Sequence, residues 1–333
     1  MNIVDAHLDL AYNAIRGRPV HLPARDQQPD DEGIPTVGLP DLRQGGVGII
    51  CGVIFCEPAS DGRAGYQTPD EAHEAAIKQL DWYRAQESSK TLGIATQSAD
   101  LNRNAPATQT ILLLEGADPI RNEKDARDFF KAGVRIVGLS WKDGTRYAGG
   151  NAAPGPLTPD GIKLIKQLDQ LGVIHDASHL AEESFWQLLE KSPGPLIASH
   201  SNCRSIVPGD RQLSDEMIRA VAKRGGVIGI NFYDRFLLPQ NEQGNRRANL
   251  KDVTTHAKHM CDLVGSANHV GLGTDMDGGL GREQIPIEIE TSVDLPRVAE
   301  ALSDDGFSDK DVAAIMGQNW MDYFARNLPK TSA

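Results

Sequence analysis

The chain has 333 residues, of which 40% are hydrophobic and 24% are charged. This composition is typical of a globular protein with a sizeable core, and the length fits two domains or one large barrel with insertions. Lys and Arg number 34 against 46 Asp and Glu, so the net charge is 34 − 46 = −12. Such an acidic chain is not expected to bind nucleic acid or an anionic membrane.

Cysteine usage and the N-terminal residues predict a cytoplasmic protein. His7 lies too close to Met1 to leave room for a signal peptide, and no run approaches 18 apolar residues. Reduced thiols are expected because the cysteines are scattered and form no C-x-x-C pair. They are Cys51, Cys56, Cys203 and Cys261.

The first predicted strand carries a possible metal-binding pair. A short apolar run beginning at Ile3 leads into His7 and Asp9, which are two residues apart. On an extended strand such residues face the same side, so both side chains could hold one metal ion. The alternative is structural: His7 would end the strand and Asp9 would begin a turn.

A long polar loop and a buried strand follow. Residues 16–35 are rich in Pro, Asp and Gln and predict a loop, whereas Val47 to Phe55 form a near-continuous apolar run. Such a run is typical of a strand buried on both faces. Thr68 and Glu71 then form a capping box with Pro69 between them, which predicts a helix that continues to about Ala85.

Six further apolar segments predict strands, and most of them end in a polar side chain. They are 111–114 ending at Glu115, 134–139 ending at Ser140-Trp141, 173–174 running into His175 to His179, 195–199 ending at His200, 227–231, and 269–274 ending at Asp275. Helices are predicted after Thr158, after Ser214 and over about Ser308 to Arg326. Trp186 and Trp320 fall on predicted helices and are expected to pack in the core.

Eight short strands separated mostly by helices predict an α/β fold, a (β/α)8 TIM-type barrel, and we expect residues 1–333 to form one barrel domain. The long loops follow the first, fourth, seventh and eighth strands, so all of them belong to the C-terminal face. In such barrels the chemistry takes place at this face.

Six candidate metal ligands end strands at that face. Three imidazoles and three carboxylates suit a borderline metal such as Zn²⁺ and exceed what one tetrahedral ion needs. Two ions that share a carboxylate use them better, with Glu115 as the bridge, and Asp275 is our choice for the base that takes a proton from the activated water. The six are His7, Asp9, Glu115, His179, His200 and Asp275.

Several patterns have simpler explanations. Residues 273–279 could form only a tight turn, and they have too few spaced carboxylates for a calcium loop. The Ser-His dipeptides at 178–179 and 199–200 lack the G-x-S-x-G elbow of a serine hydrolase. Residues 45–48 precede a strand and so do not form a dinucleotide-binding loop. His256 and His259 are expected to be surface or packing residues on a helix.

The motifs together resemble the membrane dipeptidase (renal dipeptidase, peptidase M19) family, a branch of the amidohydrolase-like metal barrels, in a divergent bacterial-type form. They occur in family order across nearly the whole chain: Asp5-Ala6-His7-Leu8-Asp9, Leu42-Arg43-Gln44-Gly45-Gly46-Val47, Glu115-Gly116, Asp176-Ala177-Ser178-His179, Ser199-His200-Ser201-Asn202, Arg211-Gln212-Leu213-Ser214-Asp215-Glu216, Gly271-Leu272-Gly273-Thr274-Asp275-Met276-Asp277-Gly278 and Gly317-Gln318-Asn319-Trp320.

The resemblance implies a binuclear zinc site. One ion would be held by His7 and Asp9 and the other by His179 and His200, with Glu115 bridging them. Asp275 would be the acid/base carboxylate. Arg211 would bind the carboxylate of the substrate, a role that suits a guanidinium group; the structural alternative for Arg211 is a surface charge beside a helix.

The sequence departs from the family after the fourth predicted strand. Family dipeptidases usually have a Thr-His pair there, whose histidine helps to hold the substrate carbonyl, whereas this chain has Ser140-Trp141. An indole offers one N–H donor and accepts no proton. Arg146 or Tyr147 could supply the missing polarising group.

These observations predict a zinc-dependent dipeptidase-like hydrolase acting on a small-molecule substrate. The alternative that Trp141 suggests is another amide, such as an N-acyl amino acid, on the same metal site. A third possibility, from a different class, is a catalytically silent metal-binding protein. A homodimer is possible because symmetric dimers are the commonest soluble assemblies.

Overall fold

The computed structural model describes residues 3–60, 64–102 and 105–330. Nine strands occur in these residues. In chain order they are β1 Ile3–Leu8, β2 Val47–Phe55, β3 Leu92–Ile94, β4 Thr108–Glu115, β5 Val134–Gly138, β6 Ile174–Asp176, β7 Leu196–Ile197, β8 Ile228–Ile230 and β9 Val270–Leu272.

Eight of these strands form a parallel barrel. Their order is β7-β6-β5-β4-β2-β1-β9-β8, and every pair is parallel. A parallel bridge between Ala198 and Ile228 joins the two ends of this order, so the barrel closes through one bridge instead of a full ladder. The predicted (β/α)8 fold is confirmed, and β3 is a short additional strand that pairs only with β4.

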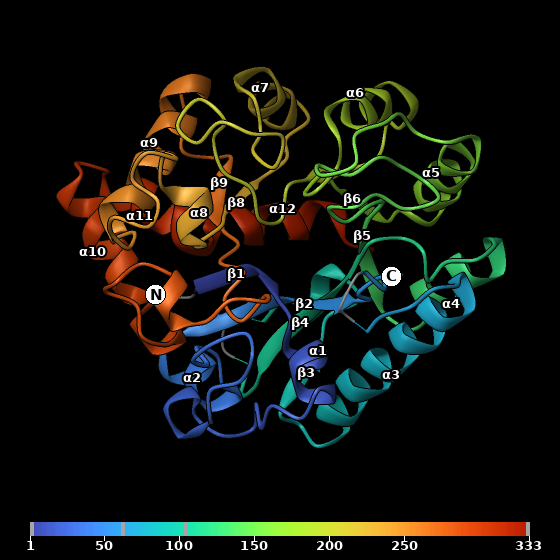
Figure 1. Ribbon diagram of the computed structural model, residues 1–333, viewed down its shortest axis with the longest axis horizontal. Coiled ribbons are helices and arrows are strands. Elements are labelled where there is room, and N and C mark those ends of the chain that lie inside the picture. The colour runs from blue at the N-terminus through green and yellow to red at the C-terminus, as the bar shows by residue number, and fades with distance from the viewer. Residues whose placement is uncertain (1–2, 61–63, 103–104, 331–333) are drawn as a thin grey trace.

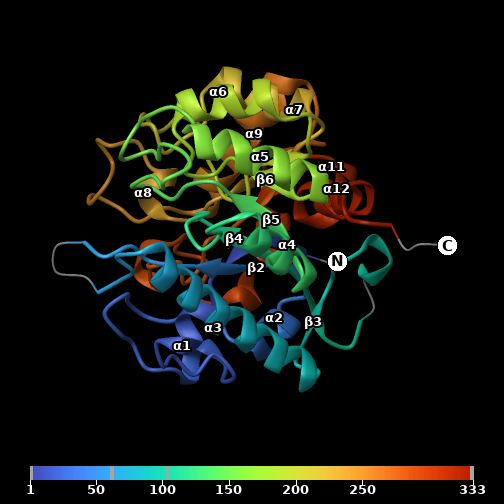
Figure 2. The same ribbon diagram turned by 90° about the vertical axis from the view of Figure 1, so that its right-hand side faces the viewer.

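Helices surround these strands (Figures 1 and 2). Those of the described residues are α1 Leu10–Ile15, α2 Leu39–Gln44, α3 Pro69–Ser88, α4 Glu123–Lys131, α5 Pro159–Leu171, α6 Glu182–Lys191, α7 Asp215–Lys223, α8 Asp234–Leu237, α9 Leu250–Val264, α10 Pro296–Asp304, α11 Asp309–Ala313 and α12 Asn319–Asn327. No described helix is long and apolar enough to cross a membrane.

The core has two parts because the strands are apolar on both faces. The outward-facing strand residues pack against the helices, while the inward-facing ones, such as Ile49, Val53 and Leu113, fill the barrel. Trp320 of α12 lies at the inner core, is fully buried as predicted, and donates its indole N–H to the Leu272 carbonyl at 3.0 Å. Helix α12 therefore closes the end of the barrel where the strands begin.

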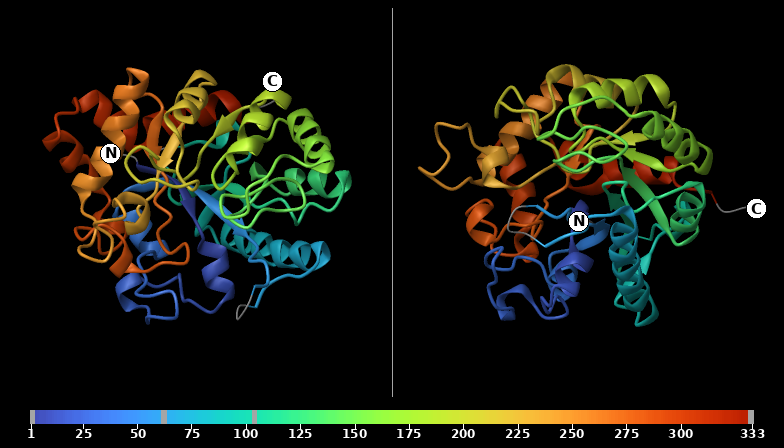
Figure 3. Two further views of the ribbon diagram at one scale, coloured as in Figure 1. Left: turned by 45° about the horizontal axis from the view of Figure 1, so that its top comes forward. Right: turned by 45° about the vertical axis from the view of Figure 1, so that its right-hand side comes forward.

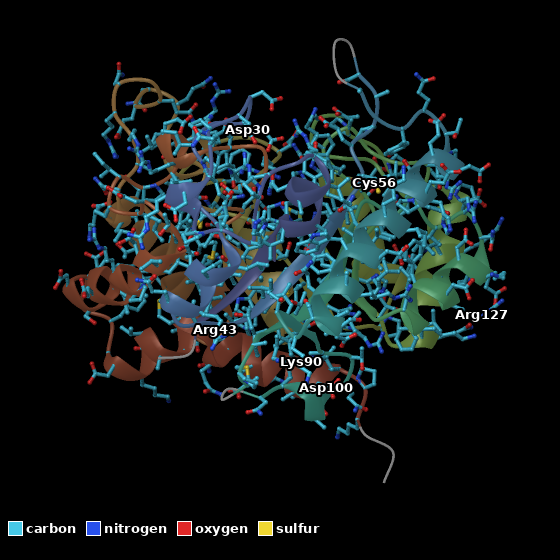
Figure 4. All side chains as sticks on the ribbon, turned by 90° about the horizontal axis from the view of Figure 1, so that it is seen from below. Asp30, Arg43, Cys56, Lys90, Asp100 and Arg127 are labelled. Atoms are coloured by element: carbon cyan, nitrogen blue, oxygen red, sulfur yellow. The ribbon has the colours of Figure 1, made fainter. Side chains whose placement is uncertain are left out.

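The two ends of the barrel differ in what they carry. Arg43, Lys90 and Asp100, which precede β2, β3 and β4, lie at one end, and Asp30 and Cys56, which follow β1 and β2, lie at the other (Figure 4). The segment that contains α8 and the segment after β2 project on the same side (Figures 2 and 3). Two of the predicted long loops, the one after β1 and the one that contains α8, thus lie at the C-terminal ends of the strands (Figures 2 and 4).

Two expectations about elements need correction. Trp186 is 39% exposed, because α6 buries Phe185 and Leu188 and the neighbouring position turns to solvent. The single helix expected over 308–326 is instead α11, a π-helical turn at Ala314–Gln318 and α12, with a non-helical backbone at Gly317. Helix α1, which lies between the first strand and the loop predicted over residues 16–35, was not predicted.

Candidate metal centre

The six predicted ligands come together at the C-terminal end of the barrel. His7 lies in β1 and Glu115 ends β4, while the others follow β1, β6, β7 and β9 within one to three residues. The exposed fraction of the six side chains is small, and none exceeds 12%. Parallel strands bring these positions together because all of their carboxyl ends meet at one face.

Glu115 occupies the middle of the cluster. Its Oε1 atom is 3.3 Å from Nε2 of His179, 3.4 Å from Nε2 of His200 and 3.6 Å from Nε2 of His7. On the other side, Nε2 of His7 is 3.7 Å from Oδ2 of Asp9 and 3.9 Å from Oδ1 of Asp275. Two groups of potential ligands therefore adjoin, Glu115–His179–His200 and His7–Asp9–Asp275.

Several buried atoms in this cluster have no hydrogen-bond partner among the described residues. They are Nε2 of His7, Oδ1 of Asp9 and Oε1 of Glu115. Leaving a buried polar atom unpaired costs about 1–3 kcal/mol. Nitrogen and carboxylate oxygen atoms in this arrangement fit bound metal ions, which would satisfy all of them at once.

The electrostatic environment of the histidines depends on their neighbours. Burial lowers the pKa of His179 and of His200 well below the usual range, so both imidazoles are neutral, the form that binds metals. Burial alone would lower the pKa of His7 as well, but the carboxylates of Glu115, Asp9 and Asp275 outweigh it and raise that pKa to about 10.

Asp275 is held in a defined orientation. Its Oδ2 atom accepts a hydrogen bond from Nδ2 of Asn231 at 2.9 Å, and its backbone has φ of 60°, in the left-handed region. His179 and Asp277 also have positive φ, at 66° and 63°. Non-glycine residues in this region are uncommon and concentrate at functional sites. Burial raises the pKa of Asp275 to about 6, which suits a group that exchanges protons.

A pocket of about 180 Å³ opens over the cluster. Besides five of the six candidate ligands it has an aromatic wall, and it meets a larger groove at Tyr12, Phe55 and Tyr233. The lining residues are Asp9, Tyr12, Glu32, Phe55, Glu57, Glu115, Trp141, Lys142, His179, His200, Tyr233, Phe236, Asp275, Gly278, Gly279 and Leu280.

Trp141 and Arg211 lie at the cluster in different ways. Trp141 lines the pocket, with its ring centroid 4.8 Å from that of Phe55 and 6.1 Å from that of His179. Arg211 lies behind His200, donating to its carbonyl at 2.7 Å and to Oγ of Ser201 at 3.2 Å. The Nε atom of Arg211 is buried and has no partner among the described residues.

Arg146 and Tyr147 do not line this pocket. Both donate to the Ile120 carbonyl, and both line a separate cavity of about 210 Å³ together with Lys163. The structure therefore does not bring them to the place of the missing polarising group. Their side chains point instead toward the segment between β4 and α4.

Sequence reasoning missed the residues that support the cluster. Oδ1 of Asn151 accepts a hydrogen bond from Nδ1 of His179 at 2.9 Å, Ser199 contacts two histidines, and Asn231 holds Asp275. Of these, only Ser199 had a signal, since it directly precedes His200 in a recognised motif.

Comparison with known proteins agrees with the fold. The family described as "Membrane dipeptidase (Peptidase family M19)" matches residues 1–326. The chain belongs to this family. It is therefore a metal-dependent hydrolase, and the predicted family membership is confirmed.

Similar proteins also occur among curated sequences and solved structures. An uncharacterized protein in the pqqA 5′ region of Klebsiella pneumoniae is 31% identical over 258 residues, 74% of this chain and 92% of that protein. An uncharacterized dipeptidase of Schizosaccharomyces pombe is 29% identical over 294 residues, 84% of this chain and 70% of that protein. A metallopeptidase from Rhodobacter sphaeroides, liganded with a phosphinate mimic of the dipeptide L-Ala-D-Ala, shares the fold with a TM-score of 0.85, at 23% identity over 98% of this chain and 99% of its own.

Proposed function

We propose that this M19 hydrolase cleaves the peptide bond of dipeptides with two Zn²⁺ ions in its pocket. The observation that carries the proposal is the convergence of three imidazole nitrogens on Oε1 of Glu115, with Nε2 of His7 and Oε1 of Glu115 itself buried and unpaired among the described residues. His7 and Asp9 would hold one ion, His179 and His200 the other, and Glu115 both. Bound zinc would polarise the scissile carbonyl and lower the pKa of a water molecule.

The residues of the chain account for the remaining steps. Asp275, whose Oδ1 atom is left free by the Asn231 hydrogen bond, would take a proton from the attacking water and pass it to the leaving amine. Arg211 would bind the carboxylate of the substrate, for which its buried, unpaired Nε–H is available. The aromatic wall of Phe55 and Trp141 would contact the apolar part of the substrate.

A second candidate substrate is an N-acyl amino acid. Trp141 favours it, because an apolar ring stands where a polar group could have met the substrate. The alternative of a silent metal-binding protein is disfavoured by membership of a hydrolase family.

The decisive experiment is a hydrolysis screen of zinc-reconstituted protein, with and without a chelator. The panel holds L,L- and L,D-dipeptides beside N-acyl amino acids. We expect chelator-sensitive dipeptide cleavage, and Asp275→Asn should abolish it while the metal content stays unchanged. Cleavage of acyl amino acids alone would overturn the dipeptide assignment, and full activity of Asp275→Asn would overturn the role of Asp275.

We also propose a cytoplasmic location and a homodimeric state. The first is supported by the cysteines, all four of which are free thiols, three of them buried. Cell fractionation tests the location, and light scattering of the purified protein tests the assembly.

A further inference from the structure

The Ser199 hydroxyl lies among three buried side chains, on the side of two imidazole rings that faces away from the pocket. Its Oγ atom is 3.1 Å from Nδ1 of His7, 2.8 Å from Nδ1 of His200 and 2.5 Å from Oδ2 of Asp176. Each of these four residues is at most 3% exposed. One hydroxyl thus contacts a candidate ligand from each of the two metal-binding groups.

The hydrogen-bonding capacity of each group fixes the direction of these bonds. An ionised carboxylate only accepts hydrogen bonds, so the Ser199 O–H donates to Asp176. The two lone pairs of the Ser199 oxygen remain and accept N–H groups from His7 and His200. Asp176 cannot turn away, because its Oδ1 atom accepts the backbone N–H of Ser178 at 3.0 Å and of Ser199 at 2.9 Å.

This arrangement sets the tautomer of both histidines. A neutral imidazole carries one N–H, and here it is placed on Nδ1. The lone pair of each ring is then on Nε2, the atom that lies 3.6 Å (His7) or 3.4 Å (His200) from Oε1 of Glu115. A metal-binding histidine is typically oriented by such a hydrogen bond from its other nitrogen.

A third cation between His7, Asp176 and His200 is the alternative explanation of this cluster. Their potential ligand atoms do lie within 4.8 Å of one another. The Ser199 oxygen, however, is within hydrogen-bond distance of all three groups and occupies the space that an ion would need.

We propose that Ser199 is a positioning residue shared by the two metal sites, orienting His7 for one ion and His200 for the other. The proposal rests on the binuclear function proposed above. It adds that one buried hydroxyl couples the affinities of the two sites, so that its removal weakens both.

Zinc binding by Ser199→Ala tests the proposal. Loss of such an orienting partner typically lowers metal affinity roughly 10- to 100-fold, and we expect this loss for both ions, measured by competition with a chromogenic chelator and by metal analysis after dialysis. Ser178→Ala is the matched control. Its hydroxyl lies in the same buried cluster, 3.1 Å from Oγ of Ser201 and 3.5 Å from Oγ of Ser199, and accepts the backbone N–H of His200 at 3.0 Å, but among the described residues it makes no hydrogen bond to an imidazole nitrogen.

A second variant, Asp176→Asn, makes a different prediction. Two backbone N–H groups require the amide oxygen at the Oδ1 position, so the new NH2 group would donate to Ser199. The Ser199 proton must then go to one imidazole, which loses its Nδ1–H. We expect one ion to be weakened and the other to stay close to its wild-type affinity.

The outcomes separate this proposal from the proposed function. Weakening of both ions in Ser199→Ala, with Ser178→Ala near wild type, supports it, whereas unchanged affinities, loss of a single ion, or an equal loss in Ser178→Ala overturns it. If Ser199→Ala does not fold, Asp176→Asn tests the proposal in its place. Weaker binding of one zinc ion in that variant supports the proposal, and unchanged affinities for both ions overturn it. Wild-type protein that binds fewer than two zinc ions would instead overturn the binuclear site itself. The melting temperatures of the metal-free proteins report any general loss of stability.

Discussion

At the scale of single residues, Asp275 divides its two carboxylate oxygens between two tasks. Oδ2 accepts the Asn231 amide, and Oδ1 lies 3.9 Å from Nε2 of His7. Asn231 is itself fixed, because its Oδ1 atom accepts the backbone N–H of Tyr233 at 2.7 Å and its backbone N–H donates to Oδ1 of Asn202. The free oxygen of Asp275 is therefore aimed at the cluster by neighbours that are not themselves candidate metal ligands.

Asn231→Asp should shift the pH profile of hydrolysis. It would place a second carboxylate about where the amide now lies 2.9 Å from Asp275, and like charges this close raise the pKa of the pair. We expect the acidic limb of the kcat/KM profile to move up by about one pH unit or more. The same change at Asn319, a buried asparagine that donates to Ala267 and Val270 beyond the other end of the barrel, is the control. An unmoved limb in Asn231→Asp would show that Asp275 does not limit the rate at low pH.

Arg211→Ala should raise KM for substrates with a free carboxylate by at least about tenfold, or ~1.4 kcal/mol. The physical reason is the loss of a charge-assisted hydrogen bond from a buried guanidinium. Arg204→Ala is the control, since Arg204 lies in the same loop but pairs with Glu182. Steady-state kinetics on one dipeptide decide the matter, and equal KM values for the two variants would contradict the role of Arg211.

The sequence predicted the six candidate ligands that come together at the barrel mouth and missed the residues that hold them. His7, Glu115, His200 and Asp275 end apolar runs, so strand periodicity alone brought them to one face. Asn231 could not be predicted, because its partner is 44 residues away in the chain and an asparagine after a strand has no particular pattern. Arg146 was misplaced because loop conformation, unlike strand alternation, leaves no period in the sequence.

At the scale of elements, the closure of the barrel depends on glycines. A Cβ atom on Gly273, just after β9, would lie 1.8 Å from the Ser199 carbonyl oxygen, and one on Gly229 of β8 would lie 2.0 Å from the same atom. The strands can approach this closely only without side chains at these positions. The backbone that carries Ser199 and His200 is thus pressed against β8 and β9.

Gly273→Ala should destabilise the fold by about 1–3 kcal/mol, the usual cost of overpacking, because a backbone atom cannot yield like a flexible side chain. It should also weaken zinc binding by displacing Ser199. Gly138→Ala in β5 is the matched control, since its Cβ would meet no atom closer than 3.8 Å. Urea unfolding of both variants tests this, and equal midpoints would show that the closure tolerates a side chain.

Helix ends were predicted correctly where one local sequence signal, such as a capping residue or a terminal glycine, determines them. The helix that starts at Pro69 has both bonds of its capping box, and α5 ends at Gly172 in the left-handed conformation. β3 was missed because a three-residue strand is too short for a pattern. Trp186 was predicted to lie in the core because tryptophan is a large apolar residue, but its position in the helix places it on the exposed face of α6.

At the scale of the whole molecule, acidic groups concentrate at the mouth of a chain with a net charge of −12. Asp9, Glu115 and Asp275 share one buried cluster, and Glu32 and Glu57 line the pocket beside them. Divalent cations that bind only the folded state would stabilise it by about 2.7 kcal/mol at a concentration of 100 Kd. Removing the metal should therefore lower the melting temperature.

The size of this metal effect should grow with pH. In the metal-free protein the three carboxylates raise the pKa of His7 from 6.5 to about 10, and the additional proton is on Nε2. Between these two pH values the folded protein therefore keeps a proton on His7 that the unfolded chain has released. Its contribution to stability is complete below pH 6.5 and is lost as pH rises toward 10. Between pH 7 and 8, below the titration of the thiols, the free energy of unfolding of metal-free protein should fall by about 1 kcal/mol. Zinc would replace that proton, so the zinc-loaded protein should show no such slope. Urea unfolding at both pH values with and without chelator measures the difference; parallel curves for loaded and metal-free protein would contradict a charged His7 at the centre of the cluster.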